Sequence, residues 1–470
     1  MSNRLTRTTL KINSRPIKVI QFGSGNFLRG FADYMIDIMN DLTSFNGNVR
    51  IIQSVSSSDN AINRQDGLYH VLVKGLSKGE TVSEIRLITC VEGTLQANND
   101  FEGFVTLASL PTVEFVISNT TESGITYIDE PFREDSISTT FPGKLTRLLW
   151  ERFNKKLKGI IVIPCELIER NGDMLREVVL KYASSWLLSD DFKQWIRDEN
   201  IFCNTLVDRI VPGFSSTVGE EVKERTGYKD NAAVMVEPYS FLAIQAPDFV
   251  RALFPAEVAN LPVKFVEDIS NYRLRKVRIL NGAHTAMMAY SYLRGFRTVR
   301  EALHDKDIER FVTALIDEEI IPTLPQPVDE LKSFSVEVMD RLKNPFLDHQ
   351  LSSIALNSID KFNVRLLPTL LEYFKRTGKT PPRIAQALAA LIVFYRGQYH
   401  EQSIPIQDNQ AVKEIFQNAW QAGIESSLPE LLANKTLWRG NNLNLLVDFK
   451  ESVQKGIVAL LNREGITNNA

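Results

Sequence analysis

The sequence predicts an α/β protein, with a mostly parallel sheet in its N-terminal domain and a mostly α-helical C-terminal domain. Two patterns indicate this: strand-like and helix-like stretches alternate through the first half, and helical periodicity dominates from residue 270 onward. At 470 residues the chain is too long for one ordinary hydrophobic core, so two domains are expected. We place them at residues 1–250 and 251–470, with the boundary fixed only loosely between about 235 and 270.

Short apolar runs rich in β-branched residues predict the strands. The first is "IKVIQF", residues 17–22, and the glycine-rich "GSGNFLRG" follows it at once. Further strands are expected at 49–55, 84–91, 113–120 and 158–165. Helical stretches such as 143–157 separate some of them, which favours a parallel sheet covered on both faces.

Composition points to a small-molecule partner. The 57 acidic and 54 basic residues nearly balance at a net charge of -3, so the chain carries no electrostatic footprint for nucleic acid or a membrane surface. The N-terminus lacks the apolar run of a secretory signal, and no stretch approaches about 18 uninterrupted apolar residues. Three scattered cysteines, Cys90, Cys165 and Cys203, fit reduced thiols better than a disulfide framework. We expect a cytoplasmic protein and leave its oligomeric state open.

No metal site is expected. The chain has only five histidines, no two of which stand at metal-ligand spacing, and its cysteines form no cluster. Any acid–base chemistry must then come from side chains, so activity should survive chelation.

The stretch "GSGNFLRG", residues 23–30, is typical of the turn that opens a Rossmann-like dinucleotide-binding domain. Gly23 permits a tight turn, and Gly25 lets backbone N–H groups approach a pyrophosphate at the positive end of the following helix. Leu28 stands where the usual pattern has its third glycine. An ordinary strand-to-helix turn is the alternative. Arg29 either adds charge near the phosphates or is solvated on the helix face.

The residues expected to bind the cofactor run from the end of the first strand into this helix: Ile20, Gln21, Phe22, Gly23, Ser24, Gly25, Asn26, Phe27, Leu28 and Arg29. Thr120, at the end of a later strand in "ISNTTESG", is expected beside them, although a simple Asn/Thr turn is the alternative. The acidic residue that usually grips the ribose is missing, because "IIQSVSSSDN" offers Gln53 and serines before Asp59. No basic cluster pairs a 2′-phosphate, so NAD is preferred over NADP.

The helical stretch "YRLRKVRILNGAHTAMMAYSYLRG", residues 272–295, carries three polar side chains among apolar ones: Lys276, Asn281 and His284. At about 100° per residue, Asn281 lies roughly 140° and His284 roughly 80° round the helix from Lys276, within one arc. The three can converge on one ligand. The alternative is structural: a buried histidine, a lysine reaching solvent, and an amide that fixes a bend.

Several strings resemble the polyol-specific long-chain dehydrogenases, the mannitol dehydrogenase family. "KVRILNGAH" resembles its active-site helix, "GSGNFLRGF" its nucleotide turn and "FCNTLVDRIVPG" its V-D-R-I segment. The longer strings "SNTTESGI", "IPCELIERNGD" and "NPFLDHQLSSIALNSIDKF" resemble a branch acting on hexuronates. The resemblance covers nearly the whole chain. It implies a metal-independent, NAD-linked interconversion of D-tagaturonate and D-altronate in hexuronate catabolism.

The resemblance also assigns roles. Hydride transfer to a ketone needs a proton donor and groups that hold the oxygen, and a lysine can donate when burial or nearby positive charge lowers its pKa. Lys276 is the expected acid/base, with Asn281 and His284 on the substrate oxygen. Asp208 and Lys361 are second-tier site residues.

One departure affects the substrate oxygen. Leu167 stands where the mannitol enzymes have an asparagine, which leaves that role vacant or passes it to Asn171. A hexuronate carboxylate also needs a cation, and Arg341, Lys361 and Arg365 are the candidates, which the sequence does not rank.

Two alternatives remain. One is a dehydrogenase of the same family acting on another polyol, an aldonate or a sugar phosphate. The other is a non-catalytic NAD-binding sensor, although a sensor has no chemical need for Lys276.

Overall fold

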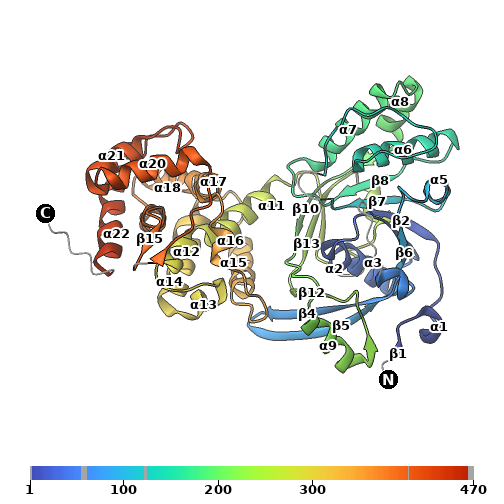
Figure 1. The fold of residues 1–470 in the computed structure, drawn as a ribbon, viewed down its shortest axis with the longest axis horizontal. Helices are drawn as coiled ribbons and strands as arrows, with labels where there is room; N and C mark the ends of the chain where they lie inside the picture. The colour runs from blue at the N-terminus through green and yellow to red at the C-terminus, as the bar shows by residue number, and fades with distance from the viewer. Residues whose placement is uncertain (1–2, 54–60, 121–123, 401, 464–470) are drawn as a thin grey trace. The chain divides into compact units, whose positions relative to one another are not determined.

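The computed structural model describes residues 3–53, 61–120, 124–400 and 402–463. The chain divides into two compact units: Met1–Lys74 with Thr81–Ile269, and Gly75–Glu80 with Ser270–Ala470. The first contains the parallel sheet and the second is mainly helical, so the predicted fold class is confirmed (Figure 1). Over the described ranges, no helix combines the length and apolar character needed to cross a membrane.

A six-stranded parallel sheet organises the first unit. Its strands, in spatial order, are β6 (Val91–Leu95), β3 (Asn48–Ile52), β2 (Ile17–Phe22), β7 (Phe115–Ser118), β8 (Ile161–Pro164) and β9 (Ile201–Phe202). Strand order therefore reverses between β2 and β7, and ligands of such open sheets bind at the carboxyl ends of the strands beside that point. The strands expected at 17–22, 113–120 and 158–165 are confirmed as neighbours in this sheet.

One expected strand lies in a different sheet. The sequence predicts a strand at 84–91, but β5 (Glu80–Ile88) neighbours β4 (Tyr69–Ser77) in a separate three-stranded sheet, and β6 takes the place in the parallel sheet. The reason is the turn between β4 and β5. Lys78 and Gly79 both have positive φ, 53° and 77°, which is the geometry of a two-residue hairpin turn.

The parallel sheet is buried on both faces because alternate side chains enter two different cores. Val19 and Ile51 pack with helix α3 (Ala32–Leu42), whereas Ile20 and Ile52 enter the other core. Four helices cover that second face: α5 (Phe101–Ala108), α6 (Phe141–Asn154), α7 (Asn171–Ser185) and α8 (Asp190–Glu199). In Figure 1, α6, α7 and α8 lie together over β7 and β8.

Two small sheets complete the core around α3. One contains β10 (Asn204–Asp208), β13 (Phe241–Gln245) and β14 (Val263–Val266), and the other contains β12 (Val234–Val236), β4 and β5. The remaining elements of this unit are short: β1 (Asn3–Arg4), α1 (Arg7–Leu10), α2 (Asn26–Gly30), α4 (Ala61–Arg64), α9 (Ser216–Thr226), β11 (Tyr228–Lys229) and α10 (Phe249–Leu253). These sheets pack against α2 and α3, the two helices that follow the glycine turn, and so help to hold the turn in place.

The second unit is built around helix α12 (Gly282–Tyr292), which is buried along nearly its whole length. It packs against α14 (Lys306–Ala314), α16 (Leu351–Ile354), α17 (Ser358–Arg365) and α19 (Pro382–Phe394). The other elements are α11 (Ser270–Arg275), α13 (Val299–His304), η3 (Ile321–Thr323), α15 (Val328–Leu342), α18 (Leu367–Thr377), β15 (Gln398–Tyr399), β16 (Gln402–Ser403), α20 (Gln410–Gln421), α21 (Ile424–Ala433), η4 (Leu443–Leu445) and α22 (Phe449–Arg463). A helix that is buried on all sides must pack against several neighbouring elements, and α12 packs against these four helices.

Two π-helices, which contact each other, interrupt the α-helices beside α12. These are η1 (Lys276–Asn281), which leads directly into α12, and η2 (Leu315–Ile320). The fully buried Glu319 of η2 accepts hydrogen bonds from the backbone N–H groups of Arg383 (2.7 Å) and Ile384 (2.9 Å). This carboxylate caps the N-terminus of α19, so η2 is fixed to the helix that supports α12.

Candidate active site

The glycine turn has the geometry that the sequence predicts for it. Gly23 has φ of +114°, and a Cβ there would lie 2.7 Å from the backbone oxygen of Asn119, so only glycine fits. A Cβ on Gly25, by contrast, would meet nothing within 4 Å. The space above Gly25 is therefore open for a group that approaches the backbone closely.

The third glycine of the usual pattern has a substitute two positions later. Leu28 is buried in the core with α3, and Gly30 at the end of α2 lies against β12. A Cβ on Gly30 would come within 2.5 Å of Val236 Cγ1. Close helix–strand packing is the task of the third glycine in a dinucleotide turn, and Gly30 performs it here. The helix is short, since α2 ends at Gly30 and α3 starts at Ala32.

Arg29 takes neither of the positions expected for it. Its side chain is buried, donates to the backbone oxygen of Ala232 and to Asn26 Oδ1 (2.5 Å), and lies over the ring of Tyr69. Burial lowers the pKa of its guanidinium from the ordinary value. These contacts hold Arg29 inside the first unit and argue against a place at the cofactor phosphates.

The other residues expected near the cofactor differ in which atoms, backbone or side chain, they can offer to it. Ile20 and Phe22 point into the core on the α5–α8 face, so only their backbone is available at the strand end. Gln21 is fully buried and donates to the Gly23 oxygen at 3.1 Å, which stabilises the turn. Ser24 and Phe27 are half-buried in and after the turn, and Asn26 is the first residue of α2.

Gln53 lies at the carboxyl end of β3, where the sequence lacks the usual ribose-binding acid. Its backbone N–H donates to the oxygen of Leu95, but its side-chain Oε1 is buried and has no hydrogen-bond partner among the described residues. Asp59 and the serines before it lie outside the described residues. An unpaired buried acceptor is costly, so this oxygen is poised to accept a hydrogen bond from a ligand hydroxyl.

A buried carboxylate that sequence reasoning missed joins the ends of β7 and β8. Glu166 accepts hydrogen bonds from Ser118 Oγ, from Thr120 Oγ1 and from the Thr120 backbone N–H, all at 3.0 Å. Burial raises its pKa, while these hydrogen bonds lower it. Thr120 is thus positioned at the strand end by Glu166. The sequence does contain a signal for Glu166, because in "PCE" an acidic residue stands only two positions after the end of an apolar strand.

Asn171 is saturated within the first unit. Its Nδ2 donates to the backbone oxygens of Pro164 (2.9 Å) and Glu166 (3.1 Å) and to Thr205 Oγ1 (3.0 Å). Its Oδ1 accepts from the backbone N–H groups of Gly172 and Thr205, both at 2.9 Å. Asn171 fixes the turn between β8 and α7, which argues against a role in holding the substrate oxygen.

Two further residues of the first unit lie near strand ends. Asp208 is the last residue of β10 and is buried. Leu167, which replaces the family asparagine, is 61% exposed and so is not part of the core. A leucine side chain has no polar atom with which to hold an oxygen, so the role of the family asparagine is vacant at this position, as expected from the sequence.

In the second unit, Lys276 and Asn281 are the first and last residues of the π-helix η1. A π-helix hydrogen-bonds i to i+5, so one wider turn brings Asn281 back towards the face of Lys276. The α-helical angle of roughly 140° is therefore wrong for this pair, and the two side chains lie closer round the axis than the sequence pattern predicts. Both are half-buried. On the same segment, the buried Nη1 of Arg278 has no hydrogen-bond partner among the described residues.

His284 lies in the first turn of α12 and is 8% exposed. Its ring makes a T-shaped contact with the exposed ring of His349, with centroids 5.0 Å apart. Burial, and then the charges of His349, Arg341 and Arg365, lower the pKa of His284 to about 3, although a hydrogen bond with the Leu280 backbone acts in the other direction. The imidazole is therefore neutral at physiological pH and can hold an oxygen as a hydrogen-bond partner.

The three candidate cations for a substrate carboxylate are gathered around this pair of histidines. Arg341 is buried, and its charge acts on His284 together with that of Arg365. Arg365 Nη1 donates to Thr285 Oγ1 at 3.1 Å, beside His284 on α12. Lys361 Nζ donates to the Ile354 oxygen at 2.9 Å, and burial followed by the charge of Arg365 lowers its pKa. We call His284, His349, Arg341, Lys361 and Arg365 the cationic cluster.

The described residues offer no metal site. No group of three or more His, Cys, Asp or Glu side chains among them is arranged to hold a metal ion. The chemistry that this arrangement can perform is proton transfer and oxyanion binding by lysine, arginine, histidine and amide groups.

A dinucleotide-type turn in one unit, and in the other a lysine and an asparagine on a π-turn with a histidine on the buried helix that follows it, are typical of an oxidoreductase of the Rossmann type. Residues 17–257 match the mannitol dehydrogenase Rossmann domain, and residues 268–459 match the mannitol dehydrogenase C-terminal domain. The chain belongs to the mannitol dehydrogenase family.

Relatives and solved structures agree with this. Altronate oxidoreductase of Bacillus subtilis (strain 168) is 42% identical over 446 residues, which cover 93% of this chain and 91% of that protein. Altronate oxidoreductase of Escherichia coli O7:K1 (strain IAI39 / ExPEC) is 42% identical over 460 residues, 95% of each chain. A D-sorbitol dehydrogenase in substrate-free form superposes with a TM-score of 0.81 at 22% identity, covering 98% of this chain and 99% of that one. A Pseudomonas fluorescens mannitol 2-dehydrogenase, solved with NAD and D-mannitol, superposes with a TM-score of 0.68 at 21% identity, covering 96% and 93%.

The neutral state of His284 predicts a pH dependence of stability. The unfolded chain takes up this proton near pH 6.5, whereas the folded chain does so only near pH 3, so stability falls as pH falls through that window. Between pH 7 and pH 5 the contribution is about 2 kcal/mol. Urea unfolding at both pH values should show the wild type losing about that much more than His284→Asn. Equal losses in the two proteins would contradict the assignment.

Proposed function

We propose that the chain is an NAD-dependent reductase that interconverts D-tagaturonate and D-altronate. The observation that carries this proposal is the cationic cluster, in which Arg341 and Arg365 act on a neutral, buried His284. A neutral polyol offers such cations no charge to pair with, whereas the carboxylate of a hexuronate does. The curated relatives at 40–43% identity are altronate oxidoreductases, which supports this substrate pair. A place in hexuronate catabolism and a cytoplasmic location both stay predictions.

The residues at the glycine turn fit a dinucleotide. Gly23 allows the turn, and the open space over Gly25 admits a pyrophosphate to the backbone N–H groups. The buried Oε1 of Gln53, at the end of β3, has no hydrogen-bond partner among the described residues and can accept a hydrogen bond from a ribose hydroxyl. The neutral amide gives a 2′-phosphate no charge to pair with. The bound cofactor supplies the hydride.

The side chains of the second unit handle the oxygen and its proton. In the reductive direction, Lys276 gives a proton to the substrate oxygen as negative charge develops there, and in oxidation it takes the proton back. Asn281 and neutral His284 hold the same oxygen by hydrogen bonds and so fix the reacting carbon in place. The π-turn aligns Lys276 and Asn281 on one side of the helix, which is the alignment that two groups sharing one oxygen need.

The carboxylate of the substrate binds to Arg365, with Arg341 and Lys361 adding charge. Arg365 projects from α17 towards α12, where its hydrogen bond to Thr285 places it one residue from His284. Lys361 lies one helical turn earlier on α17. Lys361 has the weaker claim on the carboxylate, because its ammonium already donates to the Ile354 oxygen. Asp208 stays a second-tier proposal.

Cofactor choice is tested at Gln53. The wild type should use NADH with a higher kcat/KM than NADPH, since a neutral amide offers no positive charge to a 2′-phosphate. Gln53→Ala should raise KM for NADH by about tenfold, the worth of one lost hydrogen bond, with little change in kcat. The exposed Gln194, which bonds to Asp198, provides the control Gln194→Ala. Equal or better use of NADPH by the wild type would overturn the cofactor assignment.

The role of Lys276 is tested by Lys276→Ala. Loss of a positioned acid/base should lower kcat by about two to four orders of magnitude while melting temperature and NADH binding stay near wild type. Partial rescue by a small primary amine is expected, because the amine carries the proton into the space left empty. The control is Lys375→Ala on α18, an exposed lysine of the same unit. Near wild-type kcat in a folded Lys276→Ala protein would end the hypothesis.

The substrate class is tested by Arg365→Gln. This change keeps a donor near Thr285 but removes the charge, so kcat/KM for tagaturonate should fall by about tenfold to a hundredfold. Any turnover of the neutral ketose fructose should fall much less, and the ratio of the two substrates is the measurement. If fructose is the better substrate of the wild type, or if both substrates lose equally in the variant, a neutral-polyol dehydrogenase of this family becomes the better assignment.

A further inference from the structure

Helix α17 carries two of the cations that we assign to the substrate carboxylate, Lys361 and Arg365, but it does not cap its own N-terminus. Asn357 at the N-cap has φ of +50°, and within the described part of the chain its side chain forms no capping hydrogen bond. Asp360, the acidic residue of the first turn, has 66% of its side chain exposed. The first N–H groups of a helix have no partner within the helix, so groups from other elements must hold this end in place.

Tyr395, the C-cap residue of α19, lies at this end of α17. It is buried, and its hydroxyl donates a hydrogen bond to Asp408 Oδ2. The backbone N–H groups of Ser358 and Ile359, the first two residues of α17, act on the same hydroxyl oxygen as hydrogen-bond partners. A hydroxyl that gives its proton to a carboxylate is a stronger acceptor on its other side. Tyr395 therefore connects the negative charge of Asp408 with the positive end of α17.

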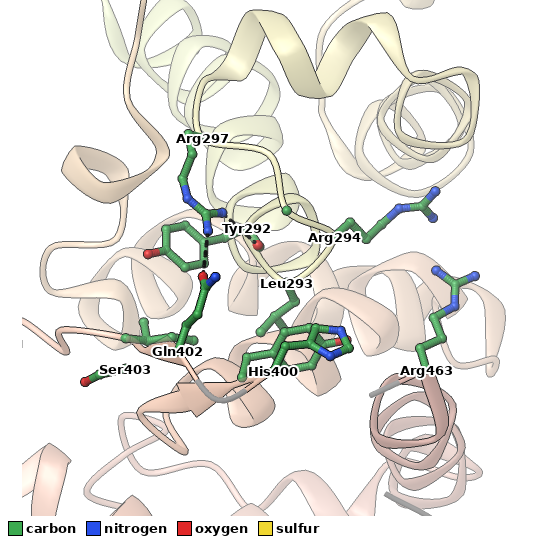
Figure 2. Close-up of a pocket in the computed structure, with 11 residues that line it drawn as sticks. Tyr292, Leu293, Arg294, Arg297, His400, Gln402, Ser403 and Arg463 are labelled. Atoms are coloured by element: carbon green, nitrogen blue, oxygen red, sulfur yellow. Dashed lines mark hydrogen bonds between the residues drawn. The ribbon is translucent and has the colours of Figure 1, made fainter. Parts of the chain in front are cut away.

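The segment from β16 to Asp408 is attached to the helical unit at both ends. The backbone N–H of Asn357 donates to the oxygen of Gln407 at 2.9 Å, which joins the segment to the start of α17. At the other end, Arg297 donates to Oε1 of Gln402 in β16 at 3.3 Å (Figure 2). These contacts hold Asp408 beside the Tyr395 hydroxyl.

Asp408 also acts on Lys361 directly. Burial and then the charge of Arg365 lower the pKa of Lys361, whereas the charge of Asp408 raises it. His349 lies near Lys361 as well, because burial and then the charge of Lys361 lower the pKa of that imidazole. Of these three neighbours of Lys361, only Asp408 is acidic, and it favours the charged ammonium that binds a carboxylate.

The alternative is that Tyr395 and Asp408 only stabilise the fold. The packing of the Tyr395 ring on Phe416, with centroids 4.5 Å apart, agrees with that explanation. It does not account for where the pair acts, however. The hydroxyl meets the start of the helix that carries both proposed carboxylate ligands, and the Asp408 carboxylate acts on one of them. The two explanations differ in the effect that they predict on substrate binding.

We propose that Tyr395 and Asp408 are positioning residues, which hold the start of α17 so that its two cations meet the substrate carboxylate together. This role rests on the proposed function and extends the site to residues that do not touch the substrate. Asp408 has the second task of keeping Lys361 charged, so that two cations rather than one attract the carboxylate.

Steady-state kinetics of Tyr395→Phe test the positioning role. The variant keeps the ring and its packing but loses the hydroxyl, so KM for tagaturonate should rise about tenfold while kcat changes less than about twofold. Tyr373→Phe, on α18 of the same unit, is the matched control and should leave both constants unchanged. A lower Tm of Tyr395→Phe with an unchanged KM would establish the structural explanation and overturn the proposal.

The pH dependence of KM tests the role of Asp408. Without its charge the ammonium of Lys361 loses its proton at lower pH, so in Asp408→Asn the rise of KM for tagaturonate should begin about one pH unit lower than in the wild type. The same change in a Lys361→Met background should shift nothing, because no ammonium is left to titrate. Asp360→Asn, an exposed acid on the same helix, is the control and should leave the profile unchanged. An unshifted profile in Asp408→Asn, or an equal shift in the Lys361→Met background, would contradict the proposal.

The wild type separates this proposal from the proposed function. If the wild type does not reduce tagaturonate, both are wrong. If it does, and neither Tyr395→Phe nor Asp408→Asn changes KM or its pH dependence, only the positioning role is wrong. Should Tyr395→Phe fail to fold, Asp408→Asn decides the question, because its amide oxygen still accepts the hydrogen bond from Tyr395 while the charge is removed.

Discussion

In the proposed site, the second unit must satisfy one constraint: a helix that is buried on all sides must still present polar groups to a substrate. Helix α12 meets the first requirement, since it is buried along nearly its whole length. The π-turn of η1 meets the second, because its wider turn aligns Lys276 with Asn281 just before the buried segment begins. A π-turn is less stable than an α-turn, so its position at these two residues is itself an argument for function.

The cationic cluster, like the π-turn, is unfavourable for the stability of the fold but favourable for binding in the proposed site. Arg341 is buried and Arg365 half-buried close to His284, and the neutral state of that imidazole shows how strongly the surroundings oppose another positive charge. Burial and then the charge of Arg365 lower the pKa of Lys361, so these two cations oppose each other in a partly dry site, which costs stability. A substrate carboxylate bound there as proposed would relieve this cost, and a hydroxyl group in the same place would relieve much less.

The sequence predicted the parts of the structure that depend on local patterns. The strand at 17–22, the turn at Gly23 and the helical second half follow from apolar runs, glycine and periodicity. The predictions from the sequence failed where contacts between residues far apart in the chain determine the structure. The strand predicted at 84–91 joins another sheet, and Glu166 gains its place only through Ser118 and Thr120, which are more than 40 residues earlier. The π-turn was also missed, because a single residue of extra turn leaves no trace in apolar periodicity; it contacts η2, which is distant in the sequence.

Burial decides how the proposed cationic cluster would recognise an anion. Arg341 is shielded from water, so its interaction with a carboxylate would be strong and only weakly screened by salt. His284, whose pKa is lowered to about 3, is neutral and would contribute a hydrogen bond rather than charge. A cluster that holds the substrate carboxylate as proposed would therefore select its substrate by charge even at cellular ionic strength.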